Sequence, residues 1–197
     1  MVRSVKRPAT VVLVVLLAVG LLAGAIWLFQ STARVGDAAP PVSGPETSAE
    51  LPGIPPDAFE LTVESVHDGD TLRARIATPN EIVTDTASTR IRLIGVDTPE
   101  ISPDLECWGA EATARLTELL PLGSTVWATP DRDVLDRYDR HLLYLWTPDG
   151  RFVNGELIAA GDATVMIFAP NDEHEGLFRE LEAEASAAGR GLWGACD

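Results

Sequence analysis

The sequence predicts one α+β domain behind an apolar N-terminus and a proline-rich spacer, and two periodicities support this fold class. Residues 59–65 and 89–95 alternate between apolar and polar side chains, which is typical of half-buried strands. Residues 107–120 and 173–188 carry apolar side chains at helical spacing. Strands that lead the domain, with helices between and after them, indicate an α+β fold.

The first thirty residues predict a membrane-targeting helix. Arg3, Lys6 and Arg7 precede an uncharged apolar run from Ala9 to Phe29, long enough as a helix to cross a hydrocarbon core of ~30 Å. Cleaved signals have shorter apolar regions of about 7 to 15 residues, which favours an uncleaved anchor. Small residues at 31–33 keep signal cleavage open as the alternative. The positive-inside rule then predicts an extracytoplasmic domain held at the cell membrane, or a secreted protein.

Residues 31–58 predict a flexible linker. They are rich in alanine, proline, glycine and acidic residues, and they show neither a helical nor an alternating apolar period. The folded domain is therefore expected to span residues 59–197, about 140 residues, which is enough for one hydrophobic core.

Inside this domain the elements follow one another closely. Pro121 and Gly123 end the first expected helix, and Asp172 with Glu175 has the spacing of a capping box for the last one. Further strands are expected at 71–77, 124–129, 141–146 and 163–168, and a further helix at 152–160.

Three short motifs carry the candidate chemistry, and each also has a plain structural interpretation. Asp-Gly-Asp-Thr at 68–71 joins two strands, where Asp-Gly by itself favours a hairpin turn. The segment 92–100 begins with an arginine and ends a strand with two carboxylates three positions apart, which alone suits a solvated strand exit. Asp-x-Tyr-x-Arg at 136–140 lies on a polar loop before a strand, where an isolated basic pair would mean little.

Taken together, in this order and at these separations, the three motifs resemble the thermonuclease (staphylococcal nuclease-like) family from about Phe59 to Trp193. The resemblance implies an OB-type five-stranded β-barrel with three α-helices, a fold whose face and loops bind oligonucleotides. It also implies a calcium-dependent nuclease that acts on DNA and RNA and leaves 3′-phosphate ends.

The resemblance assigns a metal site to Asp70, Asp97 and the main-chain carbonyl of Thr98. Hard oxygen ligands of this kind suit Ca²⁺, and the lack of a His/Cys cluster in the sequence argues against zinc. The calcium ion would bind a phosphate oxygen and make the phosphorus more electrophilic.

The same resemblance assigns the catalytic and substrate-binding residues. Glu100 would orient and deprotonate the attacking water, while Arg92 and Arg140 would stabilise the charge that builds up on the phosphorus. Arg137 and Tyr138 would bind a neighbouring phosphate.

Three positions depart from the family pattern. Met166 stands where a base-stacking tyrosine is usual, and Phe168 replaces a second tyrosine. Asp139 stands between the tyrosine and the arginine of the third motif, where glycine is common; aspartate tolerates the left-handed backbone region better than most residues.

The charge of the domain opposes easy binding of a polyanion. Residues 59–197 contain 11 arginines and no lysine against 26 aspartates and glutamates, whereas nucleic-acid binders usually show a basic footprint. The alternative to a nuclease is a catalytically silent OB-fold module that binds nucleic acid or calcium at the membrane. The protein is expected to be a monomer.

Cys107 and Cys196 are the only cysteines, and export would place both on the oxidising side of the membrane. We therefore predict a disulfide that fastens the C-terminus to the body of the fold. A cytoplasmic domain would instead leave two free thiols.

Overall fold

The computed structural model describes residues 50–196. The expected targeting helix at 1–30, most of the expected linker and Asp197 lie outside the described residues. Within residues 50–196, no helix combines the length and the apolar character that a membrane span requires.

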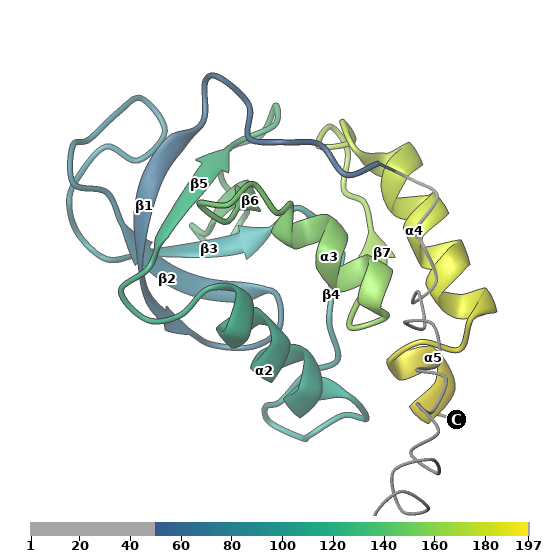
Figure 1. The fold of residues 1–197 in the computed structure, drawn as a ribbon. Coiled ribbons are helices and arrows are strands. Elements are labelled where there is room, and N and C mark those ends of the chain that lie inside the picture. Colours follow the sequence, from purple (N-terminus) through teal and green to yellow (C-terminus); the bar gives the residue numbers. More distant parts are fainter. Residues whose placement is uncertain (1–49, 197) are drawn as a thin grey trace, which may run out of the picture. The chain divides into compact units, whose positions relative to one another are not determined.

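Five strands close into a barrel in the order β1-β2-β3-β6-β5 (Figure 1). Neighbouring strands are antiparallel, except that β3 runs parallel to β6. This mixed barrel confirms the five-stranded barrel and the α+β class that the sequence predicts. The strands are β1 (Phe59–Val66), β2 (Thr71–Arg75), β3 (Thr89–Leu93), β5 (Thr125–Thr129) and β6 (His141–Trp146).

A second sheet of two short strands lies beside the barrel. Here β4 (Gly95–Asp97) pairs antiparallel with β7 (Thr164–Met166). The sequence predicted one strand across 89–95, which is wrong, because the chain leaves the barrel at Gly95. This residue has φ +76°, and a Cβ there would lie 2.4 Å from a ring carbon of Phe178. The turn and the close contact both require glycine.

Three main helices are confirmed, although each begins one or two residues later than the sequence predicted. They are α2 (Gly109–Leu119), α3 (Val153–Ala160) and α4 (Glu175–Ala187), and a four-residue helix, α5 (Leu192–Ala195), follows. Trp108 has a left-handed backbone (φ 72°), so α2 starts only at Gly109. The predicted capping box of α4 is wrong, because no side chain caps this helix. Asp172 forms an ion pair with Arg132 instead, at 2.8 Å.

The hydrophobic core fills the barrel and continues beneath α3 and α4. Leu51 and Ile54 also pack against it, although the sequence assigns them to the linker. The indole N–H of Trp146 donates to the Pro52 carbonyl at 2.9 Å, which fixes this segment on the barrel. The largest fully buried side chains include Leu61, Leu72, Tyr144, Trp146, Phe152 and Phe178.

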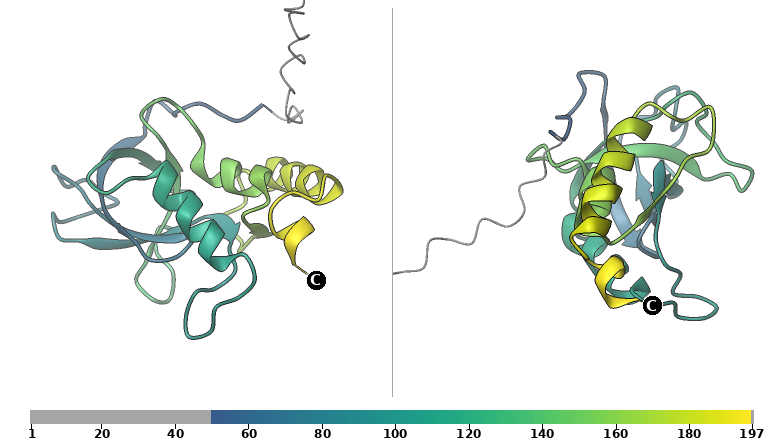
Figure 2. Two further views of the ribbon diagram at one scale, coloured as in Figure 1. Left: turned by 60° about the horizontal axis from the view of Figure 1, so that its bottom comes forward. Right: turned by 90° about the vertical axis from the view of Figure 1, so that its right-hand side faces the viewer.

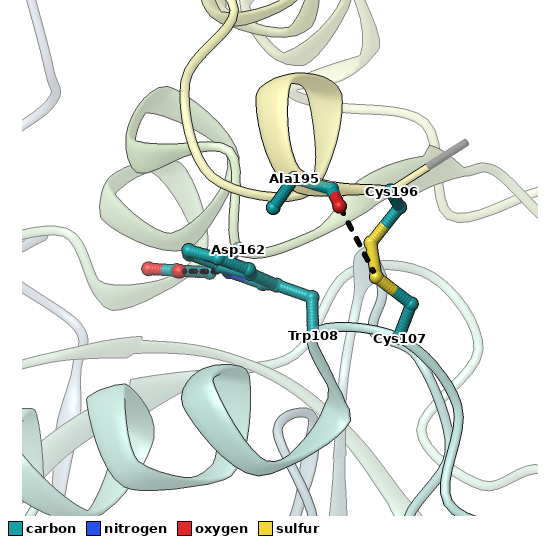
Figure 3. The surroundings of a disulfide bond; sticks show 5 residues. All are labelled: Cys107, Trp108, Asp162, Ala195 and Cys196. Carbon is teal, nitrogen blue, oxygen red and sulfur yellow. Dashed lines mark hydrogen bonds between the residues drawn. A yellow bond between two sulfur atoms is a disulfide. The ribbon is translucent and has the colours of Figure 1, made fainter.

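The predicted disulfide is present in the structure. Cys107 and Cys196, 89 positions apart in sequence, are bonded with their Cα atoms 5.9 Å apart. The bond joins the segment before α2 to the end of α5, and the next residue, Trp108, donates its indole N–H to Asp162 at 2.8 Å (Figure 3). Two other views show α5 lying near the start of α2 (Figure 2). The C-terminus is thus tied to the body of the fold.

His174, the residue just before α4, is half-buried in an aromatic cluster. Its ring lies edge-on to Tyr144 and Phe152, with centroids 4.6 and 5.0 Å away. Burial lowers the pKa of His174 from its usual value of 6.5, against the opposing carboxylates of Glu173 and Asp131. Neutral histidine is therefore the form that the fold favours.

This burial predicts a pH dependence of stability. In the unfolded chain His174 takes up a proton near pH 6.5, whereas in the folded chain it does so only at lower pH. The contribution of His174 to the free energy of unfolding is therefore fully present above pH 6.5 and declines as the pH falls through that value. We expect the free energy of unfolding to fall between pH 7.5 and 5.5 more steeply in the wild type than in His174→Phe, which keeps an aromatic ring but cannot titrate. Urea unfolding at several pH values measures this difference. Parallel pH profiles for the two proteins would contradict the prediction.

Candidate functional site

The Asp-Gly-Asp-Thr motif forms the tight turn between β1 and β2. One carboxylate oxygen of Asp68 accepts hydrogen bonds from the backbone N–H of Asp70 at 3.1 Å and of Thr71 at 2.7 Å. Gly69 lies directly against Thr98, where an added Cβ would be 2.7 Å from a side-chain carbon. The segment is therefore a turn, as Asp-Gly alone suggests, and it is a turn that sets Asp70 beside the second motif.

Arg92 joins the carboxylates of both motifs. Its guanidinium lies 2.9 Å from Asp70 Oδ2 and 3.0 Å from Asp97 Oδ1. Thr98 holds the same Asp70 oxygen through its backbone N–H at 2.9 Å and its hydroxyl at 3.1 Å. The structure thus brings together four residues that the sequence nominated from two separate segments. Asp70 comes from the turn before β2, whereas Arg92 lies on β3, Asp97 ends β4 and Thr98 follows it.

Burial makes it unfavourable for both Asp70 and Asp97 to be ionised in the folded protein. Burial raises the pKa of Asp70 to about 6, although Arg92 and the hydrogen bond from Thr98 act in the opposite direction. Burial also raises the pKa of Asp97, again against Arg92. One guanidinium therefore does not fully compensate for the two desolvated carboxylates, and an additional cation beside them would be stabilising.

The donor set fits a hard divalent cation. Asp70 and Asp97 offer only oxygen ligands, and in the part of the chain from 50 to 196 no three His, Cys, Asp or Glu side chains gather in a metal-binding group. A cation held here would thus take two carboxylates and complete its shell with main-chain oxygen and water, which calcium accepts readily.

The predicted catalytic residues line one cleft of about 690 Å³. Arg92 and Glu100 from the second motif line it, and so do Arg137, Tyr138 and Arg140 from the third motif. The predicted metal residues do not line the cleft themselves but adjoin it through Arg92. All eight nominated residues of the site are therefore connected.

The loop before β6 is organised by Asp136, a residue that the sequence interpretation left without a role. Its carboxylate accepts from Arg140 Nε at 2.7 Å, from the Arg140 backbone N–H at 3.0 Å and from the Tyr138 backbone N–H at 2.8 Å. Burial acts to raise the pKa of Asp136, but these hydrogen bonds outweigh it and the pKa is lowered. The first letter of Asp-x-Tyr-x-Arg was the signal that could have identified it. Asp139 adopts φ 59°, the left-handed conformation expected where glycine is common.

Tyr138 lies between two arginines at the rim of the cleft. Its side chain is about half exposed, and the guanidinium carbons of Arg137 and Arg140 lie 4.7 and 5.5 Å from the ring centroid. Arg137 also donates to the Tyr138 hydroxyl at 2.5 Å. These cation–π contacts hold positive charge at the cleft without neutralising it.

Glu100 is exposed at the cleft and is held by its backbone. Its N–H donates to a carboxylate oxygen of Glu106 at 2.9 Å, and the Glu106 N–H donates back to the Glu100 carbonyl at 2.9 Å. Gly109, the first residue of α2, approaches the same carbonyl so closely that an added Cβ would lie 2.6 Å from it. Glu106 is a second residue that sequence interpretation missed, since nothing in its spacing distinguishes it from other surface glutamates.

The two residues that stand where the family usually has tyrosines also lie at the cleft. Met166 and Phe168 are both part of its lining, and Phe168 is 71% exposed. An exposed aromatic ring offers a flat apolar surface on which a nucleobase can stack.

Comparison with known proteins agrees with this geometry. The family model described as "Staphylococcal nuclease homologue" matches residues 90–195. The chain is 33% identical over 134 residues to the "Thermonuclease" of Staphylococcus intermedius, covering 66% of this chain and 74% of that protein. It is 33% identical over 135 residues to an "Uncharacterized endonuclease" of Escherichia coli O157:H7, covering 68% and 77%. It is 28% identical over 154 residues to the "Thermonuclease" of Staphylococcus hyicus, covering 77% and 84%.

The family match extends over more than half of the chain and includes seven of the eight nominated site residues, from Arg92 to Arg140. Asp70 precedes the match, and the fold brings it to Arg92 and Thr98. A barrel of this topology, a cleft with this set of charged residues and relatives at this level of identity agree with one another. The chain belongs to the staphylococcal nuclease homologue family.

Proposed function

We propose that this protein is a calcium-dependent nuclease that hydrolyses phosphodiester bonds in DNA and RNA and leaves 3′-phosphate ends. One observation carries the proposal: a single cleft presents Arg92, Arg140 and Glu100, and the paired carboxylates of Asp70 and Asp97 adjoin it through Arg92. Relatives named as thermonucleases support the same chemistry.

Each residue has a role that follows from its contacts. Asp136 binds the guanidinium of Arg140 only through Nε, so both of its terminal nitrogens remain for a phosphate, and no hydrogen bond occupies them among residues 50–196. Arg92 is fixed by two carboxylates and adds positive charge at the cleft wall. Preplaced guanidinium groups stabilise the charge that develops on a pentacoordinate phosphorus.

Glu100 would act as the general base. Glu100 lines the cleft on a backbone that Glu106 and Gly109 hold in place, and from there its carboxylate would take a proton from a water molecule that attacks the phosphorus. Asp70, Asp97 and the carbonyl of Thr98 would hold Ca²⁺. When bound, that ion polarises a phosphate oxygen and offsets negative charge.

The metal proposal predicts a large effect of Asp70→Ala. We expect cleavage of DNA and RNA in calcium, none in excess EDTA, and less than about one hundredth of wild-type activity in the variant, because loss of even an outer partner of a metal ligand costs about 10- to 100-fold. Calorimetric titration should show calcium binding to the wild type and its loss in Asp70→Ala. Asp85→Ala, which removes an exposed carboxylate of the β2–β3 connection, is the matched control.

Two outcomes would reject parts of this proposal. Full cleavage in EDTA would exclude the calcium requirement. Oligonucleotide binding without cleavage under any divalent cation would favour the silent binding module.

We further propose that a helix at 1–30 exports the domain and anchors it to the membrane or is cleaved, with residues after it acting as a spacer. The run of apolar residues there and the disulfide between Cys107 and Cys196 support this location. Protease added to intact cells should degrade an anchored domain, whereas a domain released by cleavage should be recovered from the medium. Protection of the domain until lysis would reject export.

A further inference from the structure

The arginines of the folded domain differ sharply in their partners. Of the 11 arginines, eight lie within 4.0 Å of a carboxylate oxygen. These eight are Arg75, Arg92, Arg115, Arg132, Arg140, Arg151, Arg179 and Arg190. Within residues 50–196, Arg73, Arg90 and Arg137 have no carboxylate at that distance. In a domain with 26 acidic residues, three unpaired arginines need an explanation.

Two of the three face each other across neighbouring strands. Arg73 of β2 and Arg90 of β3 are direct register partners in the antiparallel pair. Both are exposed, whereas Leu72, Ala74 and Ile91 beside them are fully buried in the barrel. The two guanidinium groups therefore project from the same outer face of the sheet, where β2 and β3 lie side by side (Figure 1).

The same pair is continuous with the cleft. Arg90 donates a hydrogen bond to the main-chain carbonyl of Tyr138, which lines the cleft together with the third unpaired arginine, Arg137. Arg92, two residues beyond Arg90 on the same face of β3, lines the cleft as well. The unpaired positive charge thus extends from the cleft across the outside of β3 to β2.

The placement of two like charges opposite each other does not by itself stabilise the folded protein. Like charges directly opposite each other destabilise a sheet, and a glutamate at either position would remove the repulsion. An anion with regularly spaced charges would instead make both side chains favourable. Guanidinium groups bind phosphate oxygens in pairs, and the phosphodiester backbone of a strand that leaves the cleft supplies such phosphates.

We propose that Arg73 and Arg90 bind the backbone phosphates of a single-stranded polynucleotide beyond the scissile bond. This inference rests on the proposed function, because it assumes that the cleft holds one phosphodiester of the same strand. It explains how an acidic domain retains a polynucleotide: the local charge along the path of the strand is positive even though the net charge is not.

Binding of a fluorescent 20-nucleotide single strand, measured by anisotropy in EDTA with the probe checked for integrity, tests the proposal. We expect the double variant Arg73→Gln/Arg90→Gln to weaken binding about tenfold or more at about 50 mM salt. The slope of log affinity against log salt should become shallower by about 1.4, since each phosphate contact in a single strand contributes about 0.7. Arg75→Gln/Arg179→Gln removes the same charge from exposed, ion-paired positions and should keep the wild-type slope.

A second variant separates binding from stability. Arg73→Glu places a carboxylate opposite Arg90, so it should raise the midpoint of thermal unfolding while it weakens binding of the 20-nucleotide strand at least as much as the double variant. Wild-type affinity in Arg73→Glu, or equal affinity in the double variant and its control, would overturn the proposal. So would arginine-dependent binding to phosphatidylserine vesicles with no change for the oligonucleotide, which would identify lipid headgroups as the ligand.

The binding test gives an answer that does not depend on whether the protein cleaves nucleic acid. If the wild type binds through the arginine pair but never cleaves, the binding proposal stands and the nuclease proposal fails. If the wild type cleaves and the arginine pair contributes nothing to binding, the reverse holds.

Discussion

Replacing Arg140 with lysine is expected to lower the turnover of single-stranded DNA by roughly 100- to 1000-fold with little change in stability. Asp136 uses Nε of Arg140 and leaves its two terminal nitrogens for the phosphate. Lysine has a single ammonium group and cannot bind the carboxylate and two phosphate oxygens at once. Loss of one preplaced donor to a developing oxyanion costs about this factor in well-studied hydrolases.

Steady-state kinetics at saturating calcium, with circular dichroism to verify folding, measures the effect of Arg140→Lys. Arg179→Lys is the matched control, because Arg179 also forms an i,i+4 ion pair, with Glu175 on α4, and does not line the cleft. We expect wild-type turnover in that control. Near-normal turnover in Arg140→Lys would show that Arg140 is a surface residue and would remove it from the catalytic assignment.

Removing the disulfide is expected to produce the largest loss of stability. The bond closes a loop between positions 89 apart in sequence, for which the chain-entropy model gives about 4 to 5 kcal/mol as an upper value. The Cys107→Ser/Cys196→Ser protein should therefore unfold at a markedly lower urea concentration. Because Cys107 lies next to Glu106, whose carboxylate holds the Glu100 N–H, we also expect activity to decline before global unfolding.

Wild-type protein treated with a reductant is the control for this comparison, since it should match the double serine variant. Thiol titration of the unfolded, unreduced chain should find no free thiol. Two free thiols per chain would reject the bond and weaken the argument for export.

Local patterns were sufficient for most secondary structure. The alternation at 59–65 and the apolar spacing at 173–188 report burial directly, because strands and helices bury one face at periods of 2 and 3.6. The strand expected at 89–95 failed at Gly95, where the apolar pattern continues while the chain changes sheets. Burial looks the same on both sides of that break, so the pattern carried no signal of it.

The residues of the functional site could be identified from the sequence, but the contacts between them could not. The three motifs identify the nominated residues through resemblance, yet they do not reveal that Arg92 bridges Asp70 and Asp97, or that Asp136 fixes Arg140. Those contacts depend on side-chain directions in the closed barrel. Glu106 and the Arg73–Arg90 pair were invisible for a related reason, since their neighbours come from the loop path before α2 and from the strand register.

The sequence by itself determined the fold class, the family and the residue types available for phosphodiester chemistry, because periodicity and motif order are properties of the chain. It also determined that two cysteines were available to pair. Only the tertiary structure decided which charges neutralise one another. Ion pairing depends on distances of a few ångströms between segments far apart in sequence, so the acidic composition could not show that the unpaired arginines gather beside one cleft.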